Sequence, residues 1–266
     1  MMSTTSVVES DSELLVEKRD GVAIVLLNRP DQRNPLGRAF SEKMLRILDD
    51  LERDQEVFAI VLSGNGPAFC AGAEVGEVVS VEPMDIEFQF RLVRDFNKVS
   101  TRLRQLELPV IAAVNGVSVG GGAALALACD IIIGAEEASL YFAFGRIGAC
   151  GADMGCAYTL PRLVGSMRAR YLMLTGAHVK ADEAEKLGIF LEVLPRDALL
   201  ARAEEIARQV ISANPRRAAA ATKMALVRGE ETSWEVSLAY EGYVQSYLFQ
   251  TEDHHSRLSA FVKGKG

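Results

Sequence analysis

The chain has 266 residues, of which 49% are apolar and 24% are charged, a composition typical of a globular protein with one large core and unlike that of a disordered chain. The formal net charge of -7 argues against general binding to nucleic acid or anionic membranes, because both need a basic surface. No apolar run approaches the roughly 20 residues that span a bilayer, and segment 1–13 is polar, so we expect a flexible N-terminus over 1–13 and a cytoplasmic location.

The first elements predicted along the chain are a hairpin and a helix. Residues 14–18 and 22–27 are β-rich runs on either side of an Asp-Gly turn. Segment 38–53 has apolar residues at three- and four-residue intervals, which predicts an amphipathic helix, and 57–62 reads as a buried strand.

The order of strand, turn and helix then recurs, which predicts an α/β core over residues 14–198. Its further elements are a helix over 86–106, a strand over 110–114, a helix over 123–128 and a strand over 131–133. From residue 199 to 266 only helices are predicted, over 199–212, 215–228, 232–248 and 252–262. The apolar face of 232–248 is too broad for a solvated helix, so it must cover either its own core or a neighbouring subunit.

Two turns that contain glycine follow strand-like runs and precede helix-like ones. One spans 70–74 (Cys-Ala-Gly-Ala-Glu) and the other 119–123 (Val-Gly-Gly-Gly-Ala). Glycine often does no more than end a strand at such junctions. Two backbone N–H groups that face one point would, however, stabilise an oxyanion, as chemistry on a thioester carbonyl requires.

Other kinds of site find little support in the sequence. Neither turn has the G-x-G-x-x-G pattern of a dinucleotide site or the Lys-Ser/Thr ending of a P-loop. The four cysteines show no C-x-x-C spacing, which favours reduced thiols, and only three histidines occur. We therefore expect no metal site.

A series of motifs between residues 14 and 263 resembles the crotonase superfamily, also called the enoyl-CoA hydratase/isomerase family. They include Leu27-Asn28-Arg29-Pro30, the segment 66–74, Val114-Asn115-Gly116 with Gly120 to Gly122, and Leu160 to Gly165. The resemblance implies a crotonase-like spiral of ββα units in an α/β fold, with a C-terminal helical region that mediates trimerisation, often as a dimer of trimers.

The resemblance also implies an acyl-CoA thioester as substrate and no separate cofactor, since coenzyme A is part of the substrate. Carried over by position, the oxyanion donors are the backbone N–H groups of Ala73 and Gly121, with Ala71, Gly72 and Gly120 beside them. Arg29 or Arg33 is expected to bind the phosphates. Lys263 or Lys265 could reach the ligand of a neighbouring subunit, or could belong to a solvated tail.

The sequence departs from the hydratase pattern at both catalytic glutamates, whose positions hold Ala124 and Phe144. Neither side chain can transfer a proton, so hydration by a pair of carboxylates lacks both of its groups. Asp153 lies nearby, at a position that resembles the proton-transfer residue of double-bond isomerases and the nucleophile of the relative that displaces aryl chloride. It could equally cap a helix that begins near Met154.

These residues lead to one preferred function and two alternatives. We expect isomerisation of an enoyl thioester through Asp153, with Phe144 in the wall of the pocket and Glu74 in a structural role. The alternatives are a hydratase that uses Asp153 with a water molecule, and an acyl-CoA-binding protein without catalytic acids.

Overall fold

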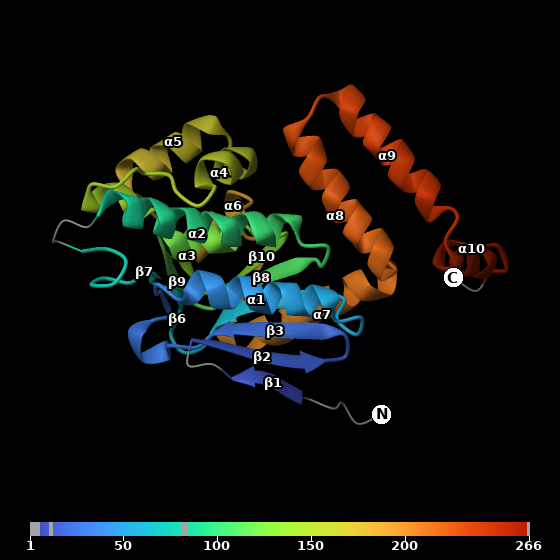
Figure 1. Cartoon of the computed structure of the whole chain (residues 1–266), viewed down its shortest axis with the longest axis horizontal. Coiled ribbons are helices and arrows are strands. Elements are labelled where there is room, and N and C mark those ends of the chain that lie inside the picture. Colours follow the sequence, from blue (N-terminus) through green and yellow to red (C-terminus); the bar gives the residue numbers. More distant parts are fainter. Residues whose placement is uncertain (1–5, 11–12, 81–84, 265–266) are drawn as a thin grey trace.

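The computed structural model describes residues 6–10, 13–80 and 85–264 (Figure 1). Its largest element is a seven-stranded sheet in the order β1-β2-β3-β5-β8-β10-β13. The first three strands are antiparallel, and the others continue from β3 in parallel. The strands are β1 (Ser6–Ser10), β2 (Leu14–Arg19), β3 (Val22–Leu27), β5 (Ala59–Gly64), β8 (Val110–Val114), β10 (Ile131–Ala135) and β13 (Val193–Leu194).

The central strands are nearly continuous apolar runs because helices and the smaller sheets cover both of their faces. All five residues of β8 and five of the six residues of β5 are buried. The predicted α/β core with strands that return in one direction is therefore confirmed for β3, β5, β8 and β10.

Two smaller sheets lie beside the large one. A four-stranded sheet has the order β12-β11-β9-β6, and a parallel pair joins β4 to β7. These strands are β4 (Pro35–Leu36), β6 (Ala68–Cys70), β7 (Gly72–Ala73), β9 (Val117–Val119), β11 (Ser139–Tyr141) and β12 (His178–Lys180). The short strands hold the two glycine-containing turns, one after β6 and one after β9.

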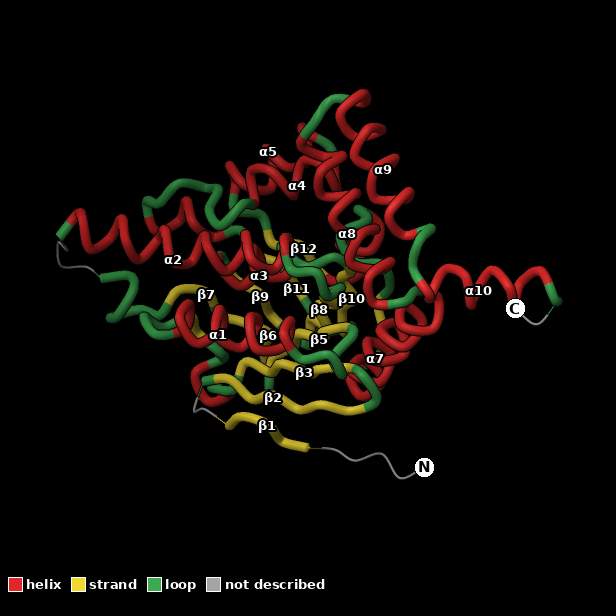
Figure 2. The backbone as a smooth tube through the Cα atoms, turned by 45° about the vertical axis from the view of Figure 1, so that its right-hand side comes forward, coloured by secondary structure: helices red, strands yellow, loops and turns green. Residues whose placement is uncertain are grey.

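Helices cover the sheets and extend beyond them (Figures 1 and 2). The α1 and α2 helices lie side by side, with the rings of Phe40 and Phe96 stacked 6.4 Å apart. The core helices are α1 (Phe40–Arg53), α2 (Ile86–Gln105), α3 (Gly121–Leu127), α4 (Cys156–Val164), α5 (Ser166–Thr175) and α6 (Ala181–Lys186), with short 3-10 helices η1 (Pro30–Gln32) and η2 (Ala143–Ile147). No helix in the described ranges is long and apolar enough to cross a membrane.

The C-terminal region is helical throughout its described part, as predicted. It contains α7 (Arg196–Ala213), α8 (Arg216–Glu231), α9 (Trp234–Leu248) and α10 (Glu252–Val262). Both views show α9 beside α8 and α10 far from the strands (Figures 1 and 2). The α9 helix buries none of its residues, and Trp234 and Tyr243 are 75% and 80% exposed. Its apolar face does not cover the core of its own chain.

The N-terminal segment differs in part from the expected flexible stretch over 1–13. Residues 6–10 form β1, which pairs with β2, while residues 1–5 and 11–12 lie outside the described residues. The outer edge of β2 offers unpaired N–H and C=O groups, and β1 takes them up. The sequence of β1, Ser-Val-Val-Glu-Ser, neither alternates between apolar and polar residues nor forms an apolar run, so it gives no strand signal.

Candidate active site

The turn after β6 is held by pairing between β4 and β7. The N–H of Ala71 donates to the carbonyl of Arg33 at 2.9 Å, and the N–H of Glu74 donates to the carbonyl of Leu36 at 3.0 Å. Successive N–H groups of an extended strand point to opposite sides. Because the N–H of the adjacent Glu74 points to β4, the N–H of Ala73 points away from β4.

The turn after β9 leads directly into α3. Gly120 has φ +51°, and its N–H donates to the carbonyl of Tyr141 at 2.8 Å. Gly121 is the first residue of α3, so its N–H has no partner within the helix.

The two turns are in van der Waals contact, and glycine is required where they touch. A Cβ on Gly72 would lie 2.6 Å from the carbonyl oxygen of Val119 and 3.6 Å from the nitrogen of Gly121. A Cβ on Gly122 would lie 2.4 Å from the carbonyl oxygen of Cys70. The fold thus brings together the two segments that carry the predicted oxyanion donors.

Asp153 lies in the loop between η2 and α4, where it does not cap the helix. The helix begins at Cys156, its N-cap is Gly155, and no side chain caps it. One carboxylate oxygen of Asp153, Oδ1, instead accepts a hydrogen bond of 2.8 Å from the N–H of the next residue, Met154. Of the two sequence interpretations of Asp153, the helix cap is therefore wrong.

Met154 connects Asp153 to the second glycine turn. Its backbone has φ +49°, an unusual conformation for a residue with a side chain, and its side chain is buried. The Met154 sulfur is 3.2 Å from the position that a Cβ on Gly121 would occupy. Strained backbone of this kind is concentrated at functional sites. The residue that follows Asp153 in the chain therefore packs on the candidate donor Gly121.

The two positions that hold glutamates in typical hydratases are apolar in the folded chain as well. Ala124 is buried within α3. Phe144 lies against the second glycine turn, with ring carbons 3.4 to 3.8 Å from the Cβ position of Gly120. Phe144 thus places an apolar ring against the second glycine turn, and it is not among the residues that line the cavity beside Asp153.

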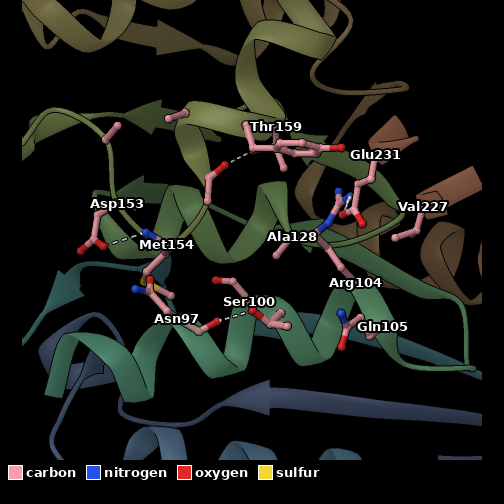
Figure 3. Close-up of a pocket in the computed structure, with 15 residues that line it drawn as sticks. Asn97, Ser100, Arg104, Gln105, Ala128, Asp153, Met154, Thr159, Val227 and Glu231 are labelled. Atoms are coloured by element: carbon pink, nitrogen blue, oxygen red, sulfur yellow. Dashed lines mark hydrogen bonds and ion pairs between the residues drawn. The ribbon is translucent and has the colours of Figure 1, made fainter. Parts of the chain in front are cut away.

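Asp153 and Met154 line a cavity of about 440 Å³ between α2, α4 and α8. Figure 3 shows Asp153 at one end of the cavity and Arg104 with Glu231 at the other. The α2 residues that line it are Asn97, Ser100, Thr101, Arg104 and Gln105. The wall also includes Val227 and Glu231 of the C-terminal helix α8. The spacing of the polar α2 residues along one helix face was the signal that could have revealed this wall.

The two arginines of the early basic loop, Arg29 and Arg33, have different surroundings. The guanidinium of Arg29 donates to both carboxylate oxygens of Glu74 at 2.6 Å and lies 3.5 Å from Glu13. The bond from Arg29 lowers the pKa of Glu74. Both terminal nitrogens of Arg29 are thus bonded within the chain, and Glu74 has a structural partner; the role of Arg29 as a phosphate ligand stays a prediction. Arg33 is exposed and forms no ion pair with any described residue.

Lys263 is not brought to the glycine turns within one chain. It follows α10, at the end of the molecule opposite β7 in Figure 1. Lys265 lies outside the described residues. A role for Lys263 at this site would therefore need a second copy of the chain.

The thiols near the site are not placed for nucleophilic chemistry. All four cysteines are free, as expected. Burial raises the pKa of Cys70 and that of Cys156 to about 12, so both stay protonated at neutral pH. In the described ranges, no cluster of three or more His, Cys, Asp or Glu side chains could hold a metal ion.

Comparison with known proteins agrees with this geometry. The family model for enoyl-CoA hydratase/isomerase matches residues 17–265. The chain is 35% identical over 254 residues to a short-chain-enoyl-CoA hydratase of Clostridium acetobutylicum, covering 95% of each protein. It is 32% identical over 249 residues to the 1,2-epoxyphenylacetyl-CoA isomerase of Escherichia coli, covering 93% of each.

A solved structure gives the same result for the fold. The enoyl-CoA hydratase of Bacillus anthracis matches with a TM-score of 0.87 at 32% identity, over 98% of this chain and 96% of that one. The chain belongs to the enoyl-CoA hydratase/isomerase family, and its α/β architecture is the crotonase fold.

Proposed function

We propose that the protein isomerises the double bond of an enoyl-CoA thioester, with Asp153 as the group that moves the proton. The observation that carries the proposal is the position of Asp153, one residue from the side chain that packs on Gly121, in a site where Ala124 and Phe144 replace the two hydratase glutamates. A single carboxylate is sufficient for a proton shuttle, whereas paired acid–base hydration needs two groups.

In the proposed reaction, the Asp153 carboxylate removes an α or γ proton from the acyl chain. The electron pair of the broken C–H bond moves into the conjugated system, and negative charge collects on the thioester oxygen. The N–H groups of Ala73 and Gly121 stabilise that oxygen. The proton now on Asp153 exchanges with solvent water, and Asp153 then protonates the other carbon, which completes the shift. Loss of one such donor typically costs about 3 kcal/mol in the transition state.

One carboxylate oxygen of Asp153 is available for the proposed proton transfer. Its Oδ1 accepts from the N–H of Met154, and this bond orients the carboxylate. The other oxygen, Oδ2, is left for the substrate. The N–H of Met154 is thus a positioning group for the proposed base.

Two other functions remain as alternatives. A hydratase that uses Asp153 with water is favoured by the name of the Clostridium acetobutylicum relative. An acyl-CoA-binding protein without turnover is favoured by the loss of both glutamate positions.

The binding of coenzyme A would use an exposed cation of the early loop. Arg33 meets this requirement, since it is exposed and its carbonyl is hydrogen bonded to Ala71 in the first glycine turn. With Arg29 bound to Glu74, Arg33 is our proposed ligand for a phosphate group.

We also propose a homotrimer, or a dimer of trimers, in which α9 is covered by a neighbouring copy. The exposed apolar side chains of α9, among them Trp234 and Tyr243, support this assembly. Sedimentation velocity on the full chain checks it: we expect a trimer or hexamer, and Tyr243→Glu should shift the population toward monomer. A wild-type monomer at micromolar concentration would contradict the assembly.

One mass-spectrometric experiment separates the three functions. The protein is incubated in D₂O with 3-enoyl-CoA and with 2-enoyl-CoA. Isomerisation gives a shifted double bond and carbon-bound deuterium without added oxygen, hydration adds an oxygen atom from the solvent, and a binding protein changes neither substrate.

The variants assign the proton transfer to a residue. Asp153→Asn keeps the size of the side chain and should slow the exchange about 100-fold or more, the usual contribution of a positioned acid–base group. Asp182→Asn, on the surface of α6, is the matched control and should react as the wild type does. Full exchange in Asp153→Asn would remove Asp153 from the mechanism.

A further inference from the structure

The cavity beyond Asp153 has one polar wall, formed by α2, although more of its surface is apolar than polar. Along α2, positions 97, 100, 101, 104 and 105 form one stripe of the helix, and each carries a polar side chain. An alkyl chain gains about 0.8 kcal/mol per buried CH₂ only when it leaves water for apolar surroundings. Here it would instead desolvate polar groups without replacing their hydrogen bonds.

One hydroxyl in this cavity is both buried and without a partner. Ser100 is 5% exposed, and its Oγ forms no hydrogen bond among the described residues. Thr101 and Thr159 differ, because their hydroxyls bond to the carbonyls of Asn97 and Gly155 in their own helices. Figure 3 shows the Ser100 side chain leaving α2 on the side of Met154. A buried polar group without a partner calls for a specific explanation, and a ligand group is one.

A second hydroxyl in the cavity wall shares this property. The phenol oxygen of Tyr158 is buried and has no hydrogen-bond partner in the described part of the chain. The ring itself is held firmly, with the guanidinium of Arg162 at 3.4 Å and that of Arg104 at 5.0 Å from its centroid. Two buried hydroxyls in one cavity point to a ligand that can form hydrogen bonds.

The charges in the cavity decide which polar ligand fits. The charged residues that line it are Arg104, Asp153 and Glu231, which sum to one negative charge. Arg104 is already paired, with Glu230 at 3.0 Å and Glu231 at 3.6 Å. No lining cation is therefore free for a carboxylate, and a second anion would be repelled.

We propose that the acyl group of the substrate carries a neutral oxygen, as a hydroxyl or a ketone, which binds to Ser100 and Tyr158 in this cavity. This inference rests on the proposed function, since it assigns the far end of the same thioester. It separates the protein from relatives that act on plain hydrocarbon chains and from those that act on acyl groups with a terminal carboxylate.

Calorimetric titration with saturated thioesters tests the proposal without any turnover, because these ligands have no double bond to shift. The probes are hexanoyl-CoA, 5-oxohexanoyl-CoA, 6-hydroxyhexanoyl-CoA and adipyl-CoA. At least one of the two oxygenated neutral ligands should bind about 3- to 10-fold more tightly than hexanoyl-CoA, the effect of one added hydrogen bond. Adipyl-CoA should bind more weakly than hexanoyl-CoA.

Variants locate the preference in the cavity. Ser100→Ala, Tyr158→Phe or the double variant should remove the preference. The ratio of the dissociation constant of hexanoyl-CoA to that of the preferred oxygenated ligand should fall to within about twofold of one, with hexanoyl-CoA affinity unchanged. Ser41→Ala is the matched control, because Ser41 is a buried serine of α1 whose hydroxyl also lacks a partner, and it does not line the cavity. It should keep the full preference.

Each remaining outcome overturns a defined part of the proposal. Equal or tighter binding of hexanoyl-CoA, with normal isomerase activity, would refute the oxygenated acyl group and leave the proposed function intact. Tightest binding of adipyl-CoA would refute the charge argument. A preference that survives in the double variant would remove Ser100 and Tyr158. If no thioester binds better than coenzyme A itself, the proposed function fails as well.

Discussion

The two sides of the candidate site carry different kinds of chemical group. On one side, the groups that we propose for substrate contact are backbone N–H groups on two turns that touch at Gly72 and Gly121. On the other side they are side chains, carried by α2 and by the largely exposed loop over residues 143–153. A backbone group can be altered only through the packing that positions it, whereas a side chain can be exchanged without disturbing its neighbours. In our proposal, the second side decides the reaction and the substrate.

The largest effect is expected for a substitution that adds one carbon atom where the two glycine turns touch. In Gly72→Ala, the new Cβ would meet the carbonyl oxygen of Val119 at 2.6 Å, and the backbone keeps φ +85°. We expect the turns to separate, the N–H of Ala73 to leave its position, and turnover to fall about 100-fold or more. Unfolding by denaturant should show a loss of about 1 to 3 kcal/mol.

A second glycine separates backbone strain from steric contact. Gly76 has φ +95°, and a Cβ there would meet no atom of the described residues within 4 Å. Gly76→Ala should therefore cost about 1 kcal/mol of stability and leave turnover unchanged. Equal loss of activity in Gly72→Ala and Gly76→Ala would show that the contact between the turns is not what positions the donor.

The sequence predicted the glycine turns and the main secondary structure well, because glycine patterns and long apolar runs have direct physical causes. The buried strands β5 and β8 and the helix α2 were predicted to within a few residues. The two-residue strands β4 and β7 were not predicted, since two residues have no periodicity and their pairing depends on contacts between distant segments. Those contacts also decide that Asp153 faces a cavity and does not cap α4.

The contacts of the side chains at the site were harder to predict, because the residues that meet there come from separate parts of the chain. The bond between Arg29 and Glu74 joins positions 45 residues apart, so the sequence offered Arg29 and Arg33 as equivalent candidates. The cavity joins α2 to α4 and α8, and no local pattern indicates that these helices meet. Ser100 was recognisable only as one polar residue in an amphipathic helix.

The two arginines of the early loop, Arg29 and Arg33, repeat this contrast between a partly buried contact and an exposed group. Arg29→Ala removes a paired group, so it should cost about 1 to 3 kcal/mol of stability at neutral pH. Arg29 lowers the pKa of Glu74, so this contribution is present above about pH 4.3 and is lost as the pH falls through the lowered pKa.

Arg33→Ala removes an exposed cation instead. It should leave stability unchanged and weaken binding of free coenzyme A about 2- to 5-fold at low salt, with a smaller difference at high salt. Arg53→Ala, an exposed arginine at the end of α1, is the control for net charge. If Arg33→Ala and Arg53→Ala give the same salt dependence, Arg33 binds no phosphate, and coenzyme A must be held by cations from another part of the assembly.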